Sequence, residues 1–393
     1  MSVTLHSGRL LLRGGFQTES LVVAGDGTIA YVGPREAAPR AEGSLIDLEG
    51  RLVAPGFIDL HTHGGHGVTF GRMETLAEDL RHYSAWVVGT GVTGFLCTVA
   101  APDADTLLHL VSRYAELFEE ETWPGATPLG LHLEGPFLNE EKKGAFSSDW
   151  LRTPRLDEVE SLLEAGRGWI RQTTVAPELP GAAEVAALFR RRGVVVSLGH
   201  TDADYETAAA VLTGAFTHVT HTFNAQRGFH HRDPGVLGAV LTSDHVTAEL
   251  IADTVHVHPA AMKVLIRCLG TERVVLITDA MAGAGLPDGD YDLVGQRVTV
   301  KDGKATLADG TIAGSAATME GCVRNLNRRV GVGLPDAVKM ASLNPAGVLG
   351  LRGSLGSLQV GKRANLVVMD EDLNVGMAMV EGRIVYDRQK GTS

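Results

Sequence analysis

The stretch Pro55-Gly56-Phe57-Ile58-Asp59-Leu60-His61-Thr62-His63-Gly64-Gly65-His66-Gly67 begins as a buried strand and ends in glycines. Side chains alternate along a strand, so Asp59, His61 and His63 share one face, while Ile58 and Leu60 point the other way. Two imidazoles on one face, two residues apart, can bind one metal ion. Because a lone His-x-His pair is also common where nothing binds, the metal interpretation depends on the rest of the chain.

Composition limits the classes of protein to which the chain can belong. It has 393 residues, of which 44% are hydrophobic, enough for a large core. A net charge of −12 argues against general binding of nucleic acid or of anionic membranes. The three cysteines form no Cys-x-x-Cys motif, no apolar run reaches the length of a membrane span, and the first residues do not resemble a signal peptide. We therefore expect a cytoplasmic protein.

Apolar runs alternate with amphipathic helical patterns along the middle of the chain. Continuously apolar strands suit a parallel sheet covered on both faces, and eight such units predict a (β/α)₈ barrel. A doubly wound open sheet is the alternative, but no Gly-x-Gly-x-x-Gly follows the first strand. The predicted strands are 53–61, 93–99, 130–134, 172–176, 194–199, 216–221, 247–252 and 273–278, and the clearest helices are 74–88, 103–120, 182–192 and 203–212.

Both ends of the chain contain short strand-like runs separated by glycine turns. Neither end is long enough to bury a core alone, so we expect the two to form one small β-sandwich. The predicted organisation is a barrel over residues 53–352 and a β-sandwich built from residues 1–52 and 353–393. Residues 291–307 form an extra β-like segment after the eighth strand.

Polar, titratable side chains occur at the ends of six of the eight predicted strands. A barrel of this kind places its chemistry at the carboxyl ends of its strands. Singly, such residues have ordinary structural roles, since a buried histidine often satisfies a backbone carbonyl and an aspartate often caps a helix. Their repetition at one end of one barrel indicates a site for one or two divalent metals. The residues are His61, His63, His132, Glu134, His200, His221, Asp253, His256 and Asp279.

The pattern of these residues resembles the amidohydrolase superfamily. Many members carry a metal-bridging carboxylated lysine on strand four, but residues 173–178 contain no lysine, which leaves Glu134 as the substitute. With that substitution, the chain resembles the N-acetylglucosamine-6-phosphate deacetylases from about residue 50 onward. The shared motifs are Leu-His-Leu-Glu-Gly-Pro-Phe-Leu-Asn at 131–139, Lys-Lys-Gly at 142–144, Gly-His-Thr at 199–201, Thr-His-Thr-Phe-Asn-Ala at 220–225, Ile-Ala-Asp at 251–253 and Gly-Ser at 314–315.

The resemblance implies a role for each site residue. His61 and His63 would bind one metal and His200 and His221 the other, with Glu134 shared. Asp279 would act as the general base, and His256 would hydrogen-bond the developing oxyanion. Because some members lack the first His-x-His and hold a single metal, this chain is expected to bind two, either zinc or iron. We expect His66 and His132 to be structural or to support the metal ligands.

Substrate contacts are predicted at the loops that follow the metal ligands. Asn224, Ala225, Ala145 and Met319 are the expected substrate-binding residues, together with His256. The basic run from His230 to Arg232 stands out in an acidic chain, and a guanidinium can grip phosphate through two hydrogen bonds. In the family an arginine in this place reaches the phosphate from a partner subunit, which implies a homodimer with Arg232 acting in trans.

These observations predict a metal-dependent enzyme that deacetylates N-acetylglucosamine 6-phosphate. Phe146 stands where many members carry a sugar-binding histidine or glutamine, and Gln226 stands where methionine is common. Phe146 keeps open a related substrate, either another N-acetylhexosamine phosphate or an N-acyl amino acid. A non-catalytic binding protein of the same fold is the alternative from another class, but it predicts loss of metal ligands or of Asp279, all of which are present.

Overall fold

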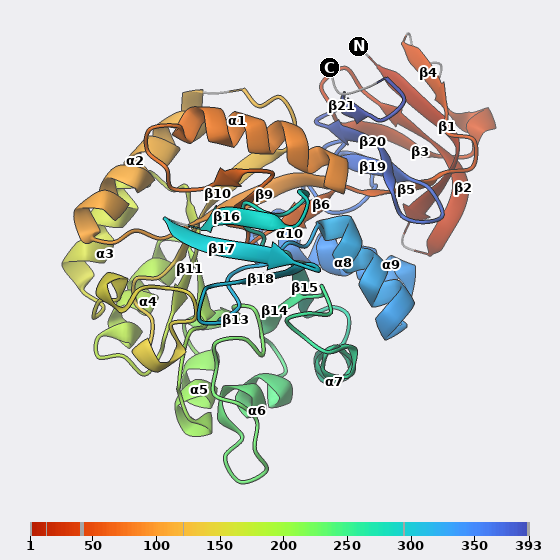
Figure 1. The fold of residues 1–393 in the computed structure, drawn as a ribbon. Coiled ribbons are helices and arrows are strands. Elements are labelled where there is room, and N and C mark those ends of the chain that lie inside the picture. Colours follow the sequence, from red (N-terminus) through yellow and green to blue (C-terminus); the bar gives the residue numbers. More distant parts are fainter. Residues whose placement is uncertain (1, 13, 40–42, 121, 294, 391–393) are drawn as a thin grey trace.

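The computed structural model describes residues 2–12, 14–39, 43–120, 122–293 and 295–390. Its centre is an eight-stranded sheet in which every neighbouring pair is parallel and the strands follow chain order. This sheet confirms the α/β class predicted from the alternating pattern (Figure 1). The strands are β6 (Phe57–Asp59), β9 (Val92–Val99), β10 (Thr127–Glu134), β11 (Ile170–Val175), β12 (Val195–Leu198), β13 (Phe216–Val219), β14 (Thr247–Ile251) and β15 (Val274–Ile277).

Helices connect these strands and cover the sheet (Figure 1). The predicted helices are confirmed with small shifts at their ends. The helix expected from residue 203 begins at Tyr205, because the side chain of Asp204 caps its first turn by accepting the Thr207 N–H. The helices are α1 (Leu76–Val87), α2 (Ala104–Glu120), α3 (Leu156–Ala165), α4 (Ala182–Arg191), α5 (Tyr205–Leu212), α6 (Gly235–Thr242), α7 (Pro259–Leu269), α8 (Met319–Asn325), α9 (Leu334–Ala341) and α10 (Leu343–Val348).

Strands from both ends of the chain form one further eight-stranded sheet, and Figure 1 shows both termini beside it. The two ends meet where β19 pairs antiparallel with β5. The strands are β1 (Val3–Leu12), β2 (Gly15–Val23), β3 (Ile29–Gly33), β4 (Ser44–Asp47), β5 (Leu52–Pro55), β19 (Leu366–Met369), β20 (Val375–Val380) and β21 (Arg383–Asp387).

The strand predicted over residues 53–61 is divided between the two sheets. Its first part, β5, belongs to the sheet of the chain ends, and its second part, β6, begins the central sheet. Gly56 separates them, and a Cβ there would lie 2.2 Å from the Thr93 hydroxyl oxygen of β9. Glycine is therefore needed where the chain passes close to β9 on its way from one sheet to the other.

The edges of the central sheet are connected just beyond the ends of β6 and β15. The Asp279 N–H donates to the His61 carbonyl at 2.8 Å, and the His63 N–H donates to the Ala280 carbonyl at 2.8 Å. Thr62 and Ala280 form a parallel bridge between the same two segments. These hydrogen bonds bring the first and last predicted strand ends together, although they are more than 200 residues apart in sequence.

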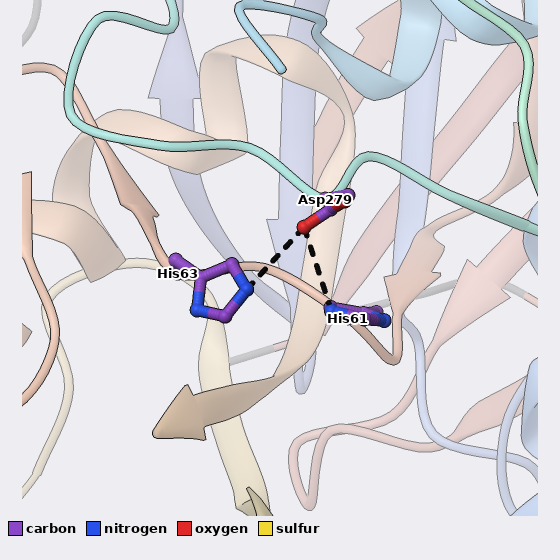
Figure 2. Close-up of side chains that lie close together, drawn as sticks. All are labelled: His61, His63 and Asp279. Atoms are coloured by element: carbon purple, nitrogen blue, oxygen red, sulfur yellow. Dashed lines mark ion pairs between the residues drawn. The ribbon is translucent and has the colours of Figure 1, made fainter. Parts of the chain in front are cut away.

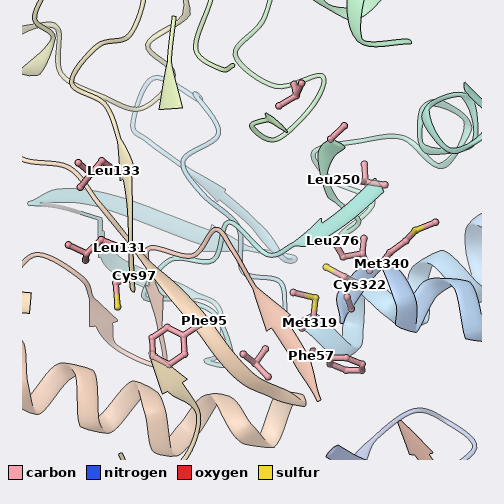
Figure 3. Packing of buried hydrophobic residues seen from close by; sticks show 14 of the residues in the cluster. Phe57, Phe95, Cys97, Leu131, Leu133, Leu250, Leu276, Met319, Cys322 and Met340 are labelled. Carbon is pink, nitrogen blue, oxygen red and sulfur yellow. The ribbon is translucent and has the colours of Figure 1, made fainter. Parts of the chain in front are cut away.

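Alternate residues of β10 have opposite environments. Leu131 and Leu133 of β10 belong to the main hydrophobic cluster, whereas the intervening His132 and the following Glu134 are buried polar groups. Figure 3 shows part of that cluster, in which Leu276 of β15 is joined by Met319 and Cys322 of α8. On β10 one face is thus apolar and the other carries polar groups, whereas β15 is apolar on both faces, since Val275 and Ile277 belong to a second buried cluster.

Three short antiparallel strands, β16 (Gly289–Leu293), β17 (Gln296–Lys301) and β18 (Lys304–Thr306), follow β15 and confirm the predicted extra β segment. Two two-residue strands, β7 (Gly64–Gly65) and β8 (Val68–Thr69), follow the His-x-His pair. Among the described residues, no helix combines the length and the apolar composition needed to cross a bilayer.

Candidate active site

His61, His63 and Asp279 form one compact buried group. His61 and His63 follow β6, and Asp279 follows β15, so the connection between these strands brings them together. The Asp279 Oδ1 atom lies 3.5 Å from His61 Nε2 and 3.3 Å from His63 Nε2 (Figure 2). Their ligand atoms lie within 4.8 Å of one another, a spacing suitable for holding one metal ion.

Glu134, His200 and His221 form the second such group. Glu134 Oε1 lies 3.2 Å from His200 Nε2 and 3.1 Å from His221 Nε2, and the two histidine nitrogens are 3.0 Å apart. Glu134 also reaches the first group, with Oε1 3.3 Å from His61 Nε2 and Oε2 3.0 Å from His63 Nε2. This carboxylate therefore stands between the two groups, in the shared position implied by the resemblance.

The charges of the two groups depend on one another. Burial opposes ionisation of Glu134, but the adjacent His61 ring and hydrogen bonds from His200 and His221 hold the pKa of Glu134 well below its usual range. Burial lowers the pKa of His63, yet its hydrogen bonds with Asp279 and Glu134 outweigh burial and raise that pKa to about 9. The carboxylates thus stabilise positive charge in the site. Protons on the histidines can supply that charge, and a divalent cation can supply it in their place.

The hydrogen bonds of the histidines fit a metal centre. His200 Nδ1 lies 2.8 Å from the Lys142 carbonyl, which can only accept, so Nδ1 carries a proton. Its Nε2 can therefore donate to Glu134 only when the ring is doubly protonated, and in the neutral ring the Nε2 lone pair faces Glu134 and His221. His61 Nε2 is buried and has no hydrogen-bond partner, although two carboxylates lie nearby. Lone pairs directed at anions are unfavourable unless a cation lies between them. Both groups therefore fit divalent metal ions.

A cavity of about 250 Å³ opens beside both groups. Among the predicted site residues, it is lined by His63, Glu134, His200, His221, Asn224, Ala225, His256, Asp279 and Ala145. Phe146 also lines it and meets the His200 ring edge-on, with centroids 5.4 Å apart. Gln296 of β17 closes another side and donates to the Ala145 carbonyl at 2.8 Å.

His256 is held at the cavity by a carboxylate. Its Nδ1 lies 2.7 Å from Asp253 Oδ2, and the Asp253 side chain also accepts the N–H groups of Val255 and His256. Burial lowers the pKa of His256, but the hydrogen bond and charge of Asp253 outweigh it and raise that pKa. Asp253 thus stabilises the doubly protonated ring, the only form in which Nε2 can donate a hydrogen bond while Nδ1 donates to Asp253.

Two of the predicted substrate-binding residues do not line this cavity. Met319 is fully buried at the start of α8 and belongs to the main hydrophobic cluster, not to the cavity wall. Arg232 is exposed in the loop before α6, where its Nη1 lies 2.8 Å from His231 Nε2, and it does not line the cavity of its own chain. The neighbouring Arg227 is paired with Asp202 at 2.7 Å.

The two histidines expected to be structural have well-defined surroundings. His132 is buried between the hydroxyl groups of Thr98 and Thr174, at 3.2 and 2.8 Å. Burial and the neighbouring His61 lower the pKa of His132 to about 3, so this ring is neutral. His66 stacks against Trp86 and contacts His82 through a 3.1 Å hydrogen bond. Neither belongs to the two ligand groups.

Sequence reasoning missed Glu249, which is fully buried in β14. Burial opposes its ionisation, but His61 and His218 outweigh burial and hold the pKa of Glu249 well below its usual range. The available signal was a carboxylate between Ala248 and Leu250, in a strand expected to be covered on both faces. A buried carboxylate in such a strand requires polar partners inside the protein.

Comparison with known proteins identifies the family. The Amidohydrolase family model matches residues 52–385. The N-acetylglucosamine-6-phosphate deacetylase of Vibrio furnissii is 36% identical over 94% of this chain and 92% of its own length. The N-acetylgalactosamine-6-phosphate deacetylase of Escherichia coli O157:H7 is 36% identical over 98% of this chain and 99% of its own.

A solved structure gives the same result. The crystal structure of N-acetylglucosamine-6-phosphate deacetylase from Pasteurella multocida superposes with a TM-score of 0.89 at 31% identity, covering 98% of this chain and 99% of that one. The chain belongs to the amidohydrolase family and, as its motifs predicted, is similar to N-acetylglucosamine-6-phosphate deacetylases along most of its length.

Proposed function

We propose that this chain hydrolyses the acetamide of N-acetylglucosamine 6-phosphate, releasing glucosamine 6-phosphate and acetate. The observation that carries the proposal is the cavity bordered by two buried ligand groups that share Glu134. Relatives that match most of the chain are named for this reaction. The alternative of a non-catalytic protein is disfavoured, because every predicted metal ligand and Asp279 lie at this cavity or directly behind it.

The site would hold two divalent metal ions per subunit, either zinc or iron. His61 and His63 would contribute to one and His200 and His221 to the other, with Glu134 between them. Divalent cations bound there would polarise the acetyl carbonyl and make water more acidic. The fit rests on the convergent histidine nitrogens and on the unpartnered Nε2 of His61.

Asp279 would take a proton from the attacking water and then deliver it to the leaving amine. Positive charge on His61 and His63 lowers the pKa of Asp279 against the effect of burial, and bound cations would supply that charge in place of protons, so Asp279 would stay available as a base. In its doubly protonated form, which the charge of Asp253 favours, His256 would donate a hydrogen bond from Nε2 to the developing oxyanion while Nδ1 donates to Asp253. Asn224, Ala225 and Ala145 would contact the sugar phosphate from the cavity wall.

The architecture that we infer around this site is a closed (β/α)₈ barrel over residues 53–352, with a small β-sandwich built from residues 1–52 and 353–393. The chain-order parallel sheet and the hydrogen bonds between the ends of β6 and β15 support closure of the barrel.

We further propose a cytoplasmic homodimer in which Arg232 reaches the phosphate bound by the other subunit. Its exposure outside its own cavity supports a role across an interface.

A second substrate, N-acetylgalactosamine 6-phosphate, is favoured by one observation. Phe146 forms part of the cavity wall in the place where a polar sugar contact is common in the family. The relative named for that sugar matches nearly the whole chain at 36% identity. The same replacement makes N-acyl amino acids worth including as a third class of substrate.

Acetate release distinguishes these possibilities. The purified protein, with its metal content measured, is assayed against both N-acetylhexosamines with and without the 6-phosphate, and against an N-acyl amino acid. The proposal predicts the highest kcat/KM for N-acetylglucosamine 6-phosphate. A higher value for the galactose epimer would establish the second candidate, and hydrolysis of the acyl amino acid alone would refute the sugar-phosphate assignment.

A further inference from the structure

The carboxylate of Glu249 is surrounded by hydrogen-bond donors. Its Oε1 atom lies 2.7 Å from Gln172 Nε2 and 3.2 Å from His218 Nε2. Its Oε2 atom lies 3.0 Å from His61 Nδ1 and accepts the His221 backbone N–H at 3.0 Å. Each carboxylate oxygen has two lone pairs, so these contacts use the full accepting capacity of the side chain.

This arrangement fixes the orientation of His61. A carboxylate that accepts at His61 Nδ1 keeps the proton on that nitrogen, so the lone pair of the neutral ring is on Nε2. That nitrogen faces Glu134 and Asp279, at 3.3 and 3.5 Å. The opposite tautomer would direct an N–H into the ligand group and leave no lone pair there for a metal.

The same oxygen also holds a ligand of the other group. His221 has a backbone φ of 25°, outside the ordinary range for a non-glycine residue, and its N–H donates to Glu249 Oε2. Surrounding contacts must hold a residue in such a conformation. Glu249 therefore contacts one residue from each ligand group without lining the cavity itself.

We propose that Glu249 is a positioning residue that sets the tautomer of His61 and thereby makes the His61–His63 group competent to bind metal. The inference rests on the proposed function, because it presumes that this group holds a metal ion. A carboxylate behind a metal-ligating histidine both fixes the ring and makes it more basic, and loss of such a partner usually weakens metal affinity.

Replacement of Glu249 by glutamine or by methionine separates hydrogen bonding from packing. In Glu249→Gln the amide oxygen can still accept from His61 and His221, while the new NH₂ faces Gln172 and His218. Both residues can become acceptors for this NH₂. The Gln172 amide can flip to present its oxygen, and His218 can move its proton to Nδ1, which lies 2.6 Å from the Thr247 hydroxyl oxygen. Glu249→Met has similar length but accepts no hydrogen bond, so His61 is released.

The readout is metal affinity, measured by titration of the metal-free protein with Zn²⁺ and by elemental analysis after dialysis. We expect Glu249→Met to weaken binding of one of the two metals by roughly 10–100-fold. Glu249→Gln should restore most of that affinity. Gln172→Met is the matched control, since it disturbs the same buried network but leaves both contacts to Glu249 Oε2 intact, and it should bind both metals as the unmodified protein does.

Each result has a definite meaning, provided that circular dichroism shows the variants to be folded. Unchanged affinity in Glu249→Met would overturn the inference, as would equal losses in Glu249→Met and Gln172→Met, which would indicate general disruption. If Glu249→Met fails to fold, the Glu249→Gln variant becomes the test. Its amide oxygen can still accept from His61, so loss of the second metal in that variant would overturn the role assigned to this hydrogen bond. An unmodified protein that never binds a second metal would refute the two-metal proposal together with this inference.

Discussion

The Asp59 carboxylate of β6 accepts a 2.6 Å hydrogen bond from the Thr278 hydroxyl group, which follows β15. Its other oxygen lies 3.3 Å from the backbone nitrogens of both His61 and Thr278. Asp59 is 1% exposed, so these contacts are made away from solvent. The pair therefore connects the two segments that supply the first ligand group, one with His61 and His63 and the other with Asp279.

Removal of the Thr278 hydroxyl group should destabilise the protein. Thr278→Val leaves a buried Asp59 oxygen without its donor, which costs about 1–3 kcal/mol of unfolding free energy. Urea denaturation followed by circular dichroism measures the change. Thr278→Ser keeps the hydroxyl group and is the control. If the valine variant were as stable as the serine variant, the hydrogen bond would contribute nothing to the fold.

Asp279→Asn should abolish most of the turnover. The asparagine keeps the size of the side chain but cannot accept a proton, and removal of a general base typically lowers the rate by about 10²–10⁴-fold. Acetate release gives kcat, and elemental analysis on the same sample should show that metal is largely retained. Asp105→Asn, at an exposed position of α2, is the control. Near-normal turnover of the Asp279 variant would exclude the proposed role.

The protein loaded with zinc should contain about two metal equivalents per chain, since the structure has two ligand groups of the type that holds one ion each. His61→Asn combined with His63→Asn should lose one equivalent. His66→Asn, in the same loop but stacked on Trp86, should lose none. An unmodified protein that never exceeds one equivalent would show that the His61–His63 group does not bind metal under those conditions.

Arg232→Ala should weaken recognition of the phosphate. A hydrogen bond to a charged group contributes about 1.5–3 kcal/mol, so kcat/KM for the 6-phosphate should fall by roughly 10–150-fold. Activity on the unphosphorylated sugar should be low and little changed. Arg267→Ala, at an exposed position of α7, is the control. Equal losses on both sugars would mean that Arg232 supports the fold instead.

Subunit exchange tests whether Arg232 acts across a dimer interface. A hybrid of Arg232→Ala and Asp279→Asn chains would contain one site with its own Asp279 and the partner's intact arginine. Partial recovery of activity after mixing is therefore expected. If mixing yields only the sum of the two separate activities although exchange is shown to occur, Arg232 does not act in trans.

Local sequence patterns were sufficient to predict most of the strands, the class of fold and the types of residue at the site. Continuous apolar runs mark strands that are buried on both faces, and the two-residue spacing of His61 and His63 predicted that they act together, although both follow β6 and do not lie within it. The boundary at Gly56 was not predictable in this way. Both β5 and β6 are apolar, and only their pairing with different sheets separates them.

Only the tertiary structure decided which of these side chains meet. Glu249 contacts His61 across 188 positions of sequence, and Asp279 joins the His61–His63 group because hydrogen bonds connect the ends of β6 and β15. Met319, by contrast, packs into the core, and Arg232 is exposed and does not line the cavity of its own chain. A sequence determines which face and which end of a strand a residue occupies, because that depends on neighbouring residues. It does not show which groups come within hydrogen-bonding distance, because that depends on how strands and helices far apart in the sequence pack together.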